Sequence, residues 1–352
     1  MINNIFINRL KKRTSYDKKL SPTYLRNKYE AKKIWNFFKK KKYEFYKTKC
    51  DCNPIINQDY DLSKFDRDGN IFKLVICKNC GIIRAKYYLK KKFIKNFYKN
   101  FYRATVGSEN HLSDEDEFLE KKKNSKKKWD FIFKYIDKNK LDKNFKIIDY
   151  GGGSGGTLAP VSDICNCTLL EYDTKFFYIA KKNNIKTYQI TKDNFFHKKI
   201  KKPNLLILSH VVEHLPNLSE TLKFIRDKIC NDKTLIYVEF PAIDSLRDGR
   251  RNYDFFCDIQ IAHYSYFSSY VFKEIMKKSG FDFIAGTNLC QAIFIKSKSL
   301  LKSNTKNYYR QVLNDLAIAE IKNFFLIFEM KNLIRKFFPR FLINFYKSIV
   351  YK

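Results

Sequence analysis

The sequence has no long apolar run, which argues against a secreted or membrane-spanning protein. No stretch approaches the ~20 apolar residues that a membrane span requires, and residues 1–12 hold no apolar core long enough for a signal peptide. Nine cysteines without such a signal are typical of reduced thiols or metal ligands and not of disulfides. We therefore expect a cytoplasmic protein.

Acidic residues are also scarce, with 36 Asp and Glu against 70 Lys and Arg, for a net charge of +34. Such a charge can indicate a nucleic-acid or anionic-membrane partner. However, the basic residues are mostly Lys, they are scattered along the whole chain, and there is no arginine-rich cluster or RNA-binding motif. Codon bias in an AT-rich genome explains this composition, so we do not expect nucleic acid as a partner. An anionic membrane or an acidic glycan stays open.

Glycine is uncommon, with 11 in the chain, yet five of them lie between residues 151 and 156. They follow an apolar run that ends at Asp149, in the stretch KIIDYGGGSGGT. Glycine allows positive φ and lets a ligand approach the backbone without a Cβ in the way. A strand that runs into such a turn and then a helix predicts a ligand site at the edge of an α/β sheet.

Two further strand ends carry polar residues. Residues 167–171 (CTLLE) predict a second strand that ends on Glu171, an acid that can accept hydrogen bonds from both hydroxyls of a ribose. This favours a nucleoside ligand but does not distinguish S-adenosylmethionine from NAD. Residues 205–215 (LLILSHVVEHL) predict a buried strand that ends at Ser209 and is followed by two histidines and a carboxylate.

These stretches resemble the motifs of class I S-adenosylmethionine-dependent methyltransferases. The glycine turn has the spacing Asp-x-Gly-x-Gly-x-Gly of their first motif, and VVEHL resembles the segment after the fourth strand in small-molecule methyltransferases. The resemblance implies that Glu171 holds the ribose of the cofactor. The other cofactor-binding residues that it implies are Asp149, Gly151, Gly153, Gly155, Ser209 and His210.

Two close thiol pairs form a second group of interest, Cys50-x-Cys52 and Cys77-x-x-Cys80. Two such pairs can converge on one tetrahedral Zn²⁺, which binds thiolates tightly. Four thiolates leave no open position for water, so the role of the metal would be structural. Four unrelated free thiols, or a redox pair, are the alternatives.

The thiol region and the methyltransferase motifs together resemble sugar C-methyltransferases and their relatives, over residues 50–106 and 126–296. This resemblance implies that Tyr102, with Tyr98 as a weaker candidate, reaches the active site together with His214 and His263. His214 is the first choice as general base and His263 the second. The glutamate that precedes the second histidine in that family is Ala262 here. C-methylation needs a base with an orienting partner, whereas methylation of a hydroxyl needs only one histidine to take the proton, so the missing glutamate favours methylation of a hydroxyl. Packing roles for the tyrosine and for each histidine stay open.

The expected fold is α/β: a Rossmann-like class I methyltransferase sheet with a small N-terminal zinc-binding domain and a helical C-terminal tail. The tail predicts two basic amphipathic helices, 308–331 and 333–350, that either pack or lie on a membrane surface. The expected strands are 146–150, 167–171, 187–190, 204–209 and 233–239, with helices near 155–162, 174–183 and 219–229. The expected units are a basic helical extension (1–48), a zinc-binding region (49–110), a linker (111–128), the methyltransferase domain (129–298) and the tail (299–352).

The sequence thus predicts methyl transfer from S-adenosylmethionine to a small molecule, a sugar or nucleotide-sugar of surface polysaccharide biosynthesis, with structural Zn²⁺. The protein would be cytoplasmic and could lie at the inner face of the membrane. An RNA or protein methyltransferase, a NAD-linked sugar oxidoreductase and a non-catalytic scaffold are the rival interpretations.

Overall fold

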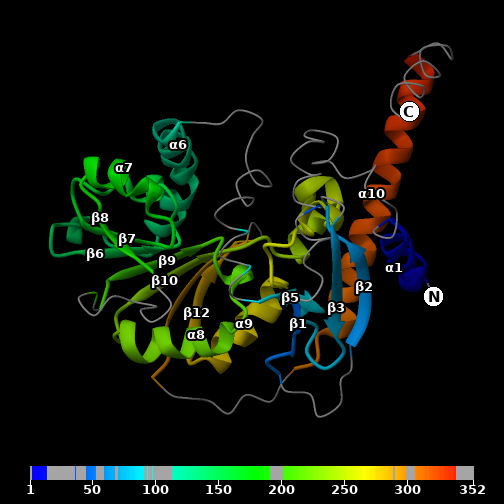
Figure 1. The fold of residues 1–352 in the computed structure, drawn as a ribbon, viewed down its shortest axis with the longest axis horizontal. Helices are drawn as coiled ribbons and strands as arrows, with labels where there is room; N and C mark the ends of the chain where they lie inside the picture. Colours follow the sequence, from blue (N-terminus) through cyan, green and yellow to red (C-terminus); the bar gives the residue numbers. More distant parts are fainter. Residues whose placement is uncertain are drawn as a thin grey trace.

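The structure is a computed structural model. It describes residues 2–13, 36, 45–52, 59–67, 70–90, 93, 97, 113–190, 200, 202–287, 290–298 and 306–337. Figure 1 shows a large sheet with helices on both of its faces, and beside it a smaller sheet that packs next to two helices from opposite ends of the chain.

The large sheet has seven strands in the order β12-β13-β10-β9-β6-β7-β8. Strands β6 to β10 are parallel, while β13 is antiparallel to both β10 and β12. Leu205 to Leu208 in β9 are all fully buried, as expected of a central parallel strand that is covered on both faces. The bounds are β6 Lys146–Tyr150, β7 Asn166–Glu171, β8 Lys186–Gln189, β9 Leu205–Ser209, β10 Leu235–Glu239, β12 Phe281–Gly286 and β13 Gln291–Lys296.

Helices cover the two faces of this sheet. Helices α6 (Asp114–Ile132) and α7 (Phe177–Lys182) pack on one face, and α8 (Leu218–Phe224) and α9 (Ser269–Lys278) pack on the other (Figure 1). A π-helical turn, η6 (Ile225–Ile229), continues α8. This arrangement confirms the expected Rossmann-like class I methyltransferase sheet.

Two expectations about local structure were wrong. Most of the expected linker 111–128 forms the first part of α6, whose Ser113 N-cap and Asp116 make a capping box. Four acids in its first turn also favour a helix start, because they face the positive end of the helix dipole. The helix expected near 155–162 is only a 3-10 turn, η3 (Gly156–Leu158), because the consecutive glycines hold the chain in a tight loop.

The smaller sheet combines the N-terminal region with a distant segment. Its order is β11-β4-β3-β2, where β2 is Asp59–Phe65, β3 is Ile71–Cys77 and β4 is Ile83–Ala85. Strand β11 (Ser265–Tyr266) comes from the long insertion after β10. We call these four strands the accessory sheet. A separate ribbon, β1 (Phe45–Lys47) with β5 (Tyr87–Leu89), lies beside it (Figure 1).

Helix α10 (Tyr309–Phe337) joins the two ends of the chain. It packs against α1 (Ile2–Arg13) through an ion pair between Arg9 and Glu320. It also packs against α9, on the large sheet, where Asp315 accepts a hydrogen bond from Tyr270 Oη at 2.7 Å. The two expected tail helices are thus one helix up to residue 337, and the break expected near Pro339 lies outside the described residues. Among the residues that the structure describes, no helix is long and apolar enough to cross a membrane.

Candidate active site

The glycine-rich turn lies between β6 and η3, at the carboxyl edge of the sheet. Gly151, Gly153 and Gly155 have φ of +71°, +60° and +82°, in the left-handed region that side chains disfavour. A Cβ on Gly152 would lie 2.2 Å from Oδ2 of Asp149. The turn therefore needs glycine for its conformation at three positions and for close approach at a fourth.

Asp149 lies directly under this turn. Its side chain is 1% exposed, and neither carboxylate oxygen has a hydrogen-bond partner among the residues that the structure describes. Burial raises the pKa of Asp149 to about 6, against the opposing effect of Lys128 and Lys121 on α6. A buried carboxylate without a partner is unfavourable, and a cationic ligand group would relieve it.

Glu171, at the end of β7, faces the same turn. One of its oxygens accepts a hydrogen bond from the backbone N–H of Gly153 at 2.8 Å, and the other from the N–H of Tyr172 at 2.6 Å. These bonds aim the carboxylate across the glycine turn. The structure therefore brings Glu171 and the turn together, as the sequence led us to expect.

Ser209 ends β9, next to β6, and belongs to a polar group that we had not expected. Lys128 Nζ donates a hydrogen bond to Ser209 Oγ at 2.7 Å and pairs with Glu239 at 2.8 Å. Ser209 Oγ in turn donates to Glu239 at 2.8 Å. Lys128 thus joins α6 to the ends of β9 and β10. It was missed because it lies in a run of lysines that we had assigned to a linker.

The segment after β9 leads from the glycine turn to the histidines. A Cβ on Gly151 would lie 3.0 Å from Cγ2 of Val211, so the segment packs against the turn. His210 has a φ of +54°, and its backbone N–H donates to the carbonyl of Glu239 at 2.7 Å. Its Nδ1 lies 3.3 Å from Oε1 of Glu213, a side chain that is 1% exposed.

His214 and His263 lie next to each other, although they are far apart in the sequence. Their ring centroids are 4.8 Å apart, with the rings nearly perpendicular at 79°. Nδ1 of His214 donates to the carbonyl of Ala262 at 3.0 Å. Because a carbonyl only accepts hydrogen bonds, Nε2 of neutral His214 carries the lone pair. Ala262, which replaces the glutamate of the C-methyltransferases, thus orients His214 through its backbone.

Burial keeps both histidines neutral at physiological pH. It lowers the pKa of His214 below its usual value, against the opposing effect of Glu213. It lowers the pKa of His263 further, and the neighbouring His214 adds to this shift. The neutral form is the one that a general base needs.

Tyr102, and Tyr98 as its weaker alternative, lie outside the described residues. A different tyrosine contacts the carbonyl that orients His214: Tyr88 in β5 donates from its hydroxyl to the carbonyl of Ala262 at 3.0 Å. Its ring also packs edge-on against Tyr264 at 4.9 Å. No local pattern in the sequence pointed to Tyr88, because only the pairing of distant segments brings it to this place.

The four cysteines converge as expected. The Sγ atoms of Cys50 and Cys80 are 3.4 Å apart, those of Cys52 and Cys77 are 3.6 Å apart, and all four lie within 4.8 Å of one another. Zn–S bonds of about 2.3 Å in a tetrahedron place sulfur atoms about 3.8 Å apart. The donor set and its spacing therefore fit one Zn²⁺ ion.

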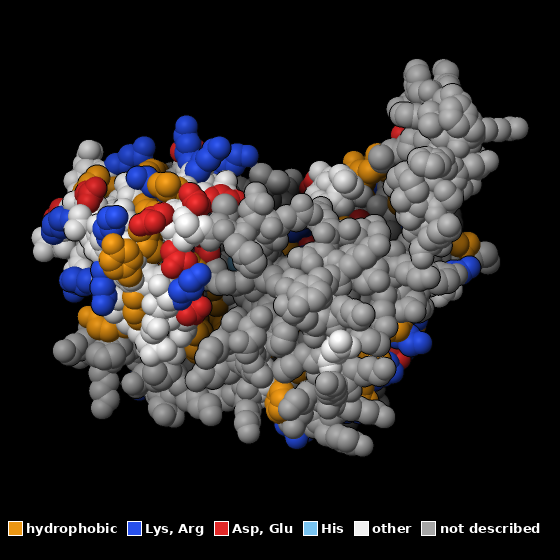
Figure 2. Space-filling model, turned by 45° about the horizontal axis from the view of Figure 1, so that its top comes forward, with side chains coloured by type: hydrophobic (Ala, Val, Ile, Leu, Met, Phe, Trp, Pro, Cys, Tyr) orange, Lys and Arg blue, Asp and Glu red, His pale blue; other side chains and the backbone are white. Residues whose placement is uncertain are grey.

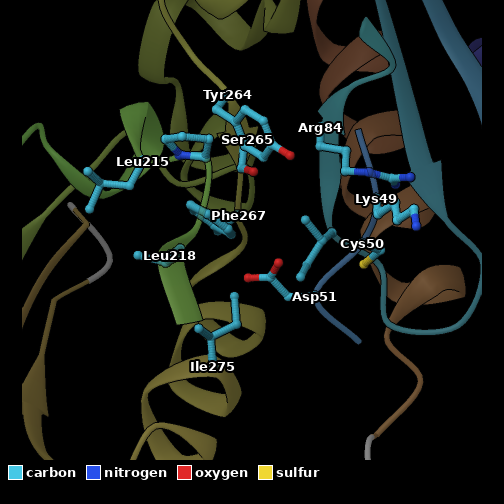
Figure 3. Close-up of a pocket in the computed structure, with 12 residues that line it drawn as sticks. Lys49, Cys50, Asp51, Arg84, Leu215, Leu218, Tyr264, Ser265, Phe267 and Ile275 are labelled. Atoms are coloured by element: carbon cyan, nitrogen blue, oxygen red, sulfur yellow. The ribbon is translucent and has the colours of Figure 1, made fainter. Parts of the chain in front are cut away.

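The cysteine region contacts the methyltransferase half next to the histidine segment. A small cavity of about 20 Å³ lies at this contact. Figure 3 shows Lys49, Cys50 and Arg84 on one side of it and Leu215 and Phe267 on the other. Below it, Asp51 accepts a hydrogen bond from Ser219 Oγ at 2.9 Å. A cavity of this size holds about one water molecule, so the two parts are closely packed here.

The basic residues of α6 are accompanied by acidic ones. On the face drawn in Figure 2, the Lys and Arg side chains over α6 and α7 alternate with Asp and Glu. Lys182 in α7 pairs with Glu115 in α6 at 3.7 Å. Lys175, in the 3-10 turn that precedes α7, pairs with Asp114 in α6 at 2.7 Å.

Comparisons with known proteins identify the family of the chain. A family model described as a methyltransferase domain matches residues 104–285, more than half of the chain. Similar solved structures include magnesium protoporphyrin IX methyltransferase from Synechocystis PCC 6803 with bound SAH, at 10% identity and a TM-score of 0.42, covering 59% of this chain and 100% of that one. Another is a possible histamine N-methyltransferase from Thermotoga maritima, at 11% identity and a TM-score of 0.34, covering 59% and 97%. No curated protein matches the chain. By its family match, this chain belongs to the methyltransferase domain family.

Proposed function

We propose that this methyltransferase uses S-adenosylmethionine, and the buried carboxylate of Asp149 carries this proposal. In dinucleotide-binding sheets the anionic pyrophosphate lies against the glycine turn, where an unpartnered carboxylate would repel it. The α-ammonium of S-adenosylmethionine is a cation that would relieve this carboxylate instead. The buried carboxylate of Asp149 therefore fits S-adenosylmethionine better than NAD.

Each cofactor-binding residue then has a role that its chemistry supports. Asp149 and the turn of Gly151, Gly153 and Gly155 hold the amino-acid end, and Glu171 accepts hydrogen bonds from the ribose hydroxyls. Ser209 and His210 line the adjacent strand end. Lys128 and Lys121 on α6 supply positive charge for the carboxylate of the cofactor. When bound, the sulfonium supplies the methyl group.

The acceptor we propose is a hydroxyl of a sugar or nucleotide-sugar, in keeping with the resemblance to sugar methyltransferases. His214 is the base: its Nε2 lone pair takes the hydroxyl proton as the new oxygen–methyl bond forms and the sulfur–methyl bond breaks. The site needs to supply little beyond alignment of the two reactants and this one proton acceptor. His263 and Tyr102 complete the acceptor side in this proposal.

The first test is a calorimetric titration of the protein with S-adenosylmethionine, S-adenosylhomocysteine and NAD. We expect micromolar binding of S-adenosylhomocysteine and none of NAD. Glu171→Ala should weaken that binding without loss of the folded state, and His214→Ala should abolish turnover while the cofactor still binds. Preferential binding of NAD would end the methyltransferase mechanism proposed here.

We also propose that Cys50, Cys52, Cys77 and Cys80 hold a structural Zn²⁺ and that the chain has three parts. These are the accessory region before residue 113, the methyltransferase domain from 113 to 298, and the C-terminal helix. The spacing of the four sulfur atoms supports the metal, and one zinc per chain in an elemental assay is the expected result. A protein purified without added chelator that contains no zinc would contradict it.

A further inference from the structure

Gln260 connects the accessory sheet to the histidine pair. Arg67, in the turn that follows β2, donates from its guanidinium to Oε1 of Gln260 at 3.0 Å and to the carbonyl of Cys257 at 3.1 Å. The other end of the Gln260 amide, Nε2, makes a hydrogen bond with Nε2 of His263. Gln260 is 8% exposed and His263 is 5% exposed, so water does not compete for these groups.

The chemistry of arginine determines which way this amide faces. A guanidinium has five N–H donors and no acceptor, so the atom of Gln260 that faces Arg67 must be the carbonyl oxygen. The amide NH₂ therefore faces His263 and donates to it. Nε2 of His263 must accept this hydrogen bond, which places the single ring proton of the neutral imidazole on Nδ1.

The protonated Nδ1 of His263 is itself a buried group without a hydrogen-bond partner among the described residues. The same holds for Oε2 of Glu213. Ligand atoms of Glu213, His214 and His263 lie within 4.8 Å of one another. The buried N–H donor of His263 thus belongs to the same small cluster as the carboxylate of Glu213 and the ring of His214.

Two histidines and a carboxylate are typical ligands of a divalent metal ion, but this tautomer of His263 does not allow metal binding. Metal binding requires a ring nitrogen with an available lone pair. In His263 one nitrogen accepts from Gln260 and the other carries the proton. A hydroxyl group matches the cluster instead, because its oxygen accepts one hydrogen bond while its proton is donated.

We propose that His263 is a hydrogen-bond donor to the acceptor hydroxyl, and that Arg67 and Gln260 are positioning residues that set its tautomer from the accessory sheet. This rests on the proposed function and replaces the role of His263 as second base. The hydroxyl oxygen accepts from Nδ1–H of His263 and gives its proton to Nε2 of His214. As negative charge develops on that oxygen, the His263 N–H stabilises it, as donors in an oxyanion site do.

The test is nitrogen-15 NMR of the imidazole rings in histidine-labelled full-length protein, which distinguishes the two tautomers. The chain has only five histidines, so each can be assigned by substitution. We expect the Nδ1–H tautomer for His263 in the wild-type protein. The Nε2–H tautomer in wild type would overturn the proposal, and this measurement needs no variant, cofactor or known acceptor.

Gln260→Glu tests the positioning role. A carboxylate accepts from both Arg67 and His263, so the ring proton should move to Nε2 and the pKa of His263 should rise. Turnover of tritiated S-adenosylmethionine with a panel of nucleoside-diphosphate hexoses should fall by roughly 10²-fold. Binding of S-adenosylhomocysteine should not change, whereas it would fail in all variants if the proposed function were wrong.

The control is Gln311→Glu, which makes the same chemical change on the exposed surface of α10 and should leave tautomer and turnover unchanged. An unaltered His263 tautomer in Gln260→Glu would refute the positioning role. A second metal ion per chain, beyond that of the cysteine cluster, that disappears in His263→Ala would also overturn the proposal.

Discussion

Asp149 is unfavourable for the fold, and the cofactor-binding role that we propose for it gives this residue a use. Its carboxylate is buried under Gly152 and has no hydrogen-bond partner in the described part of the chain, and burial raises its pKa to about 6. The unfolded chain would ionise this group near pH 4. The folded protein is therefore penalised as the pH rises from about 4 to about 6, and above that range the penalty is complete.

Asp149→Asn should therefore stabilise the ligand-free protein. At neutral pH the gain should be on the order of 2–3 kcal/mol, because the neutral amide avoids the ionisation penalty, and near pH 4 the gain should vanish. Binding of S-adenosylmethionine should weaken in the same variant. Urea denaturation at the two pH values measures the first effect, with Asp232→Asn as an exposed control. Equal stabilisation at both pH values would contradict the ionisation argument.

The pH dependence of turnover reports on His214. Because burial lowers the pKa of this imidazole, the base that we propose is neutral over most of the physiological range. We expect kcat/KM for the acceptor to rise with pH and to level off, with the midpoint of the acid limb below 6.5. A midpoint above that value would mean that another group accepts the proton.

At the scale of elements, α6 positions the cofactor site more than its sequence suggests. Its residue Phe118 lies against the glycine turn, since a Cβ on Gly156 would lie 2.4 Å from the Phe118 carbonyl. Lys128 reaches the ends of β9 and β10. The helix depends on its capping box at Ser113 because its interior is rich in exposed lysines and has little apolar surface.

Ser113→Ala should cost about 1 kcal/mol of the unfolding free energy, because it removes the side-chain acceptor for the Asp116 N–H. The affinity for S-adenosylhomocysteine should also fall slightly, since the start of α6 packs on the glycine turn. Chemical denaturation and calorimetry measure the two effects. The control is Thr174→Ala, which removes a hydroxyl from an exposed position where the helix cap is supplied by the neighbouring Asp173. Unchanged stability in Ser113→Ala would show that the helix start frays in the wild-type protein.

The strands and the glycine turn could be predicted from sequence because each is encoded in a short, contiguous pattern. Residues 205–209 are a run of apolar residues before a polar one, and the spacing of Asp149 and the glycines is local. Helix α6 could not be predicted in full, because most of its residues are Lys, Asp and Glu without a clear apolar period. The accessory sheet could not be predicted because β4 pairs with β11, from a distant part of the chain.

The same limit applies to the site. The histidines, Glu171 and the four cysteines were identified because they lie in recognisable local motifs. Arg67 and Gln260 were not, because 193 residues separate them and each is unremarkable in its own sequence context. Only the folded arrangement brings the Gln260 amide between Arg67 and His263.

At the scale of the whole molecule, hydrogen-bonded strands connect the cysteine cluster to the pair of His214 and His263. Strand β3 ends at Cys77, β4 pairs with β3 and with β11, and β11 begins two residues after His263. Loss of the metal should therefore disturb the histidine pair, although no cysteine contacts it directly in the contacts described above.

Removal of the proposed zinc by a chelator should increase amide hydrogen exchange in two places, strands β2 to β4 and residues 259–267. Strands β6 and β7, in the large sheet, should stay protected. Cys77→Ser should have the same pattern and should lower the melting temperature. Increased exchange in β2 to β4 alone would show that the metal supports only its own region.

The pairing of α1 with α10 has a consequence for protein synthesis. Arg9 and its partner Glu320 are 311 residues apart. Strand β4 likewise pairs with β11, which is synthesised much later. On the ribosome, the methyltransferase strands from β6 to β10 emerge in an unbroken series and can assemble as they appear. Helix α1, although made before all of them, finds its partner α10 only after all of them have been made.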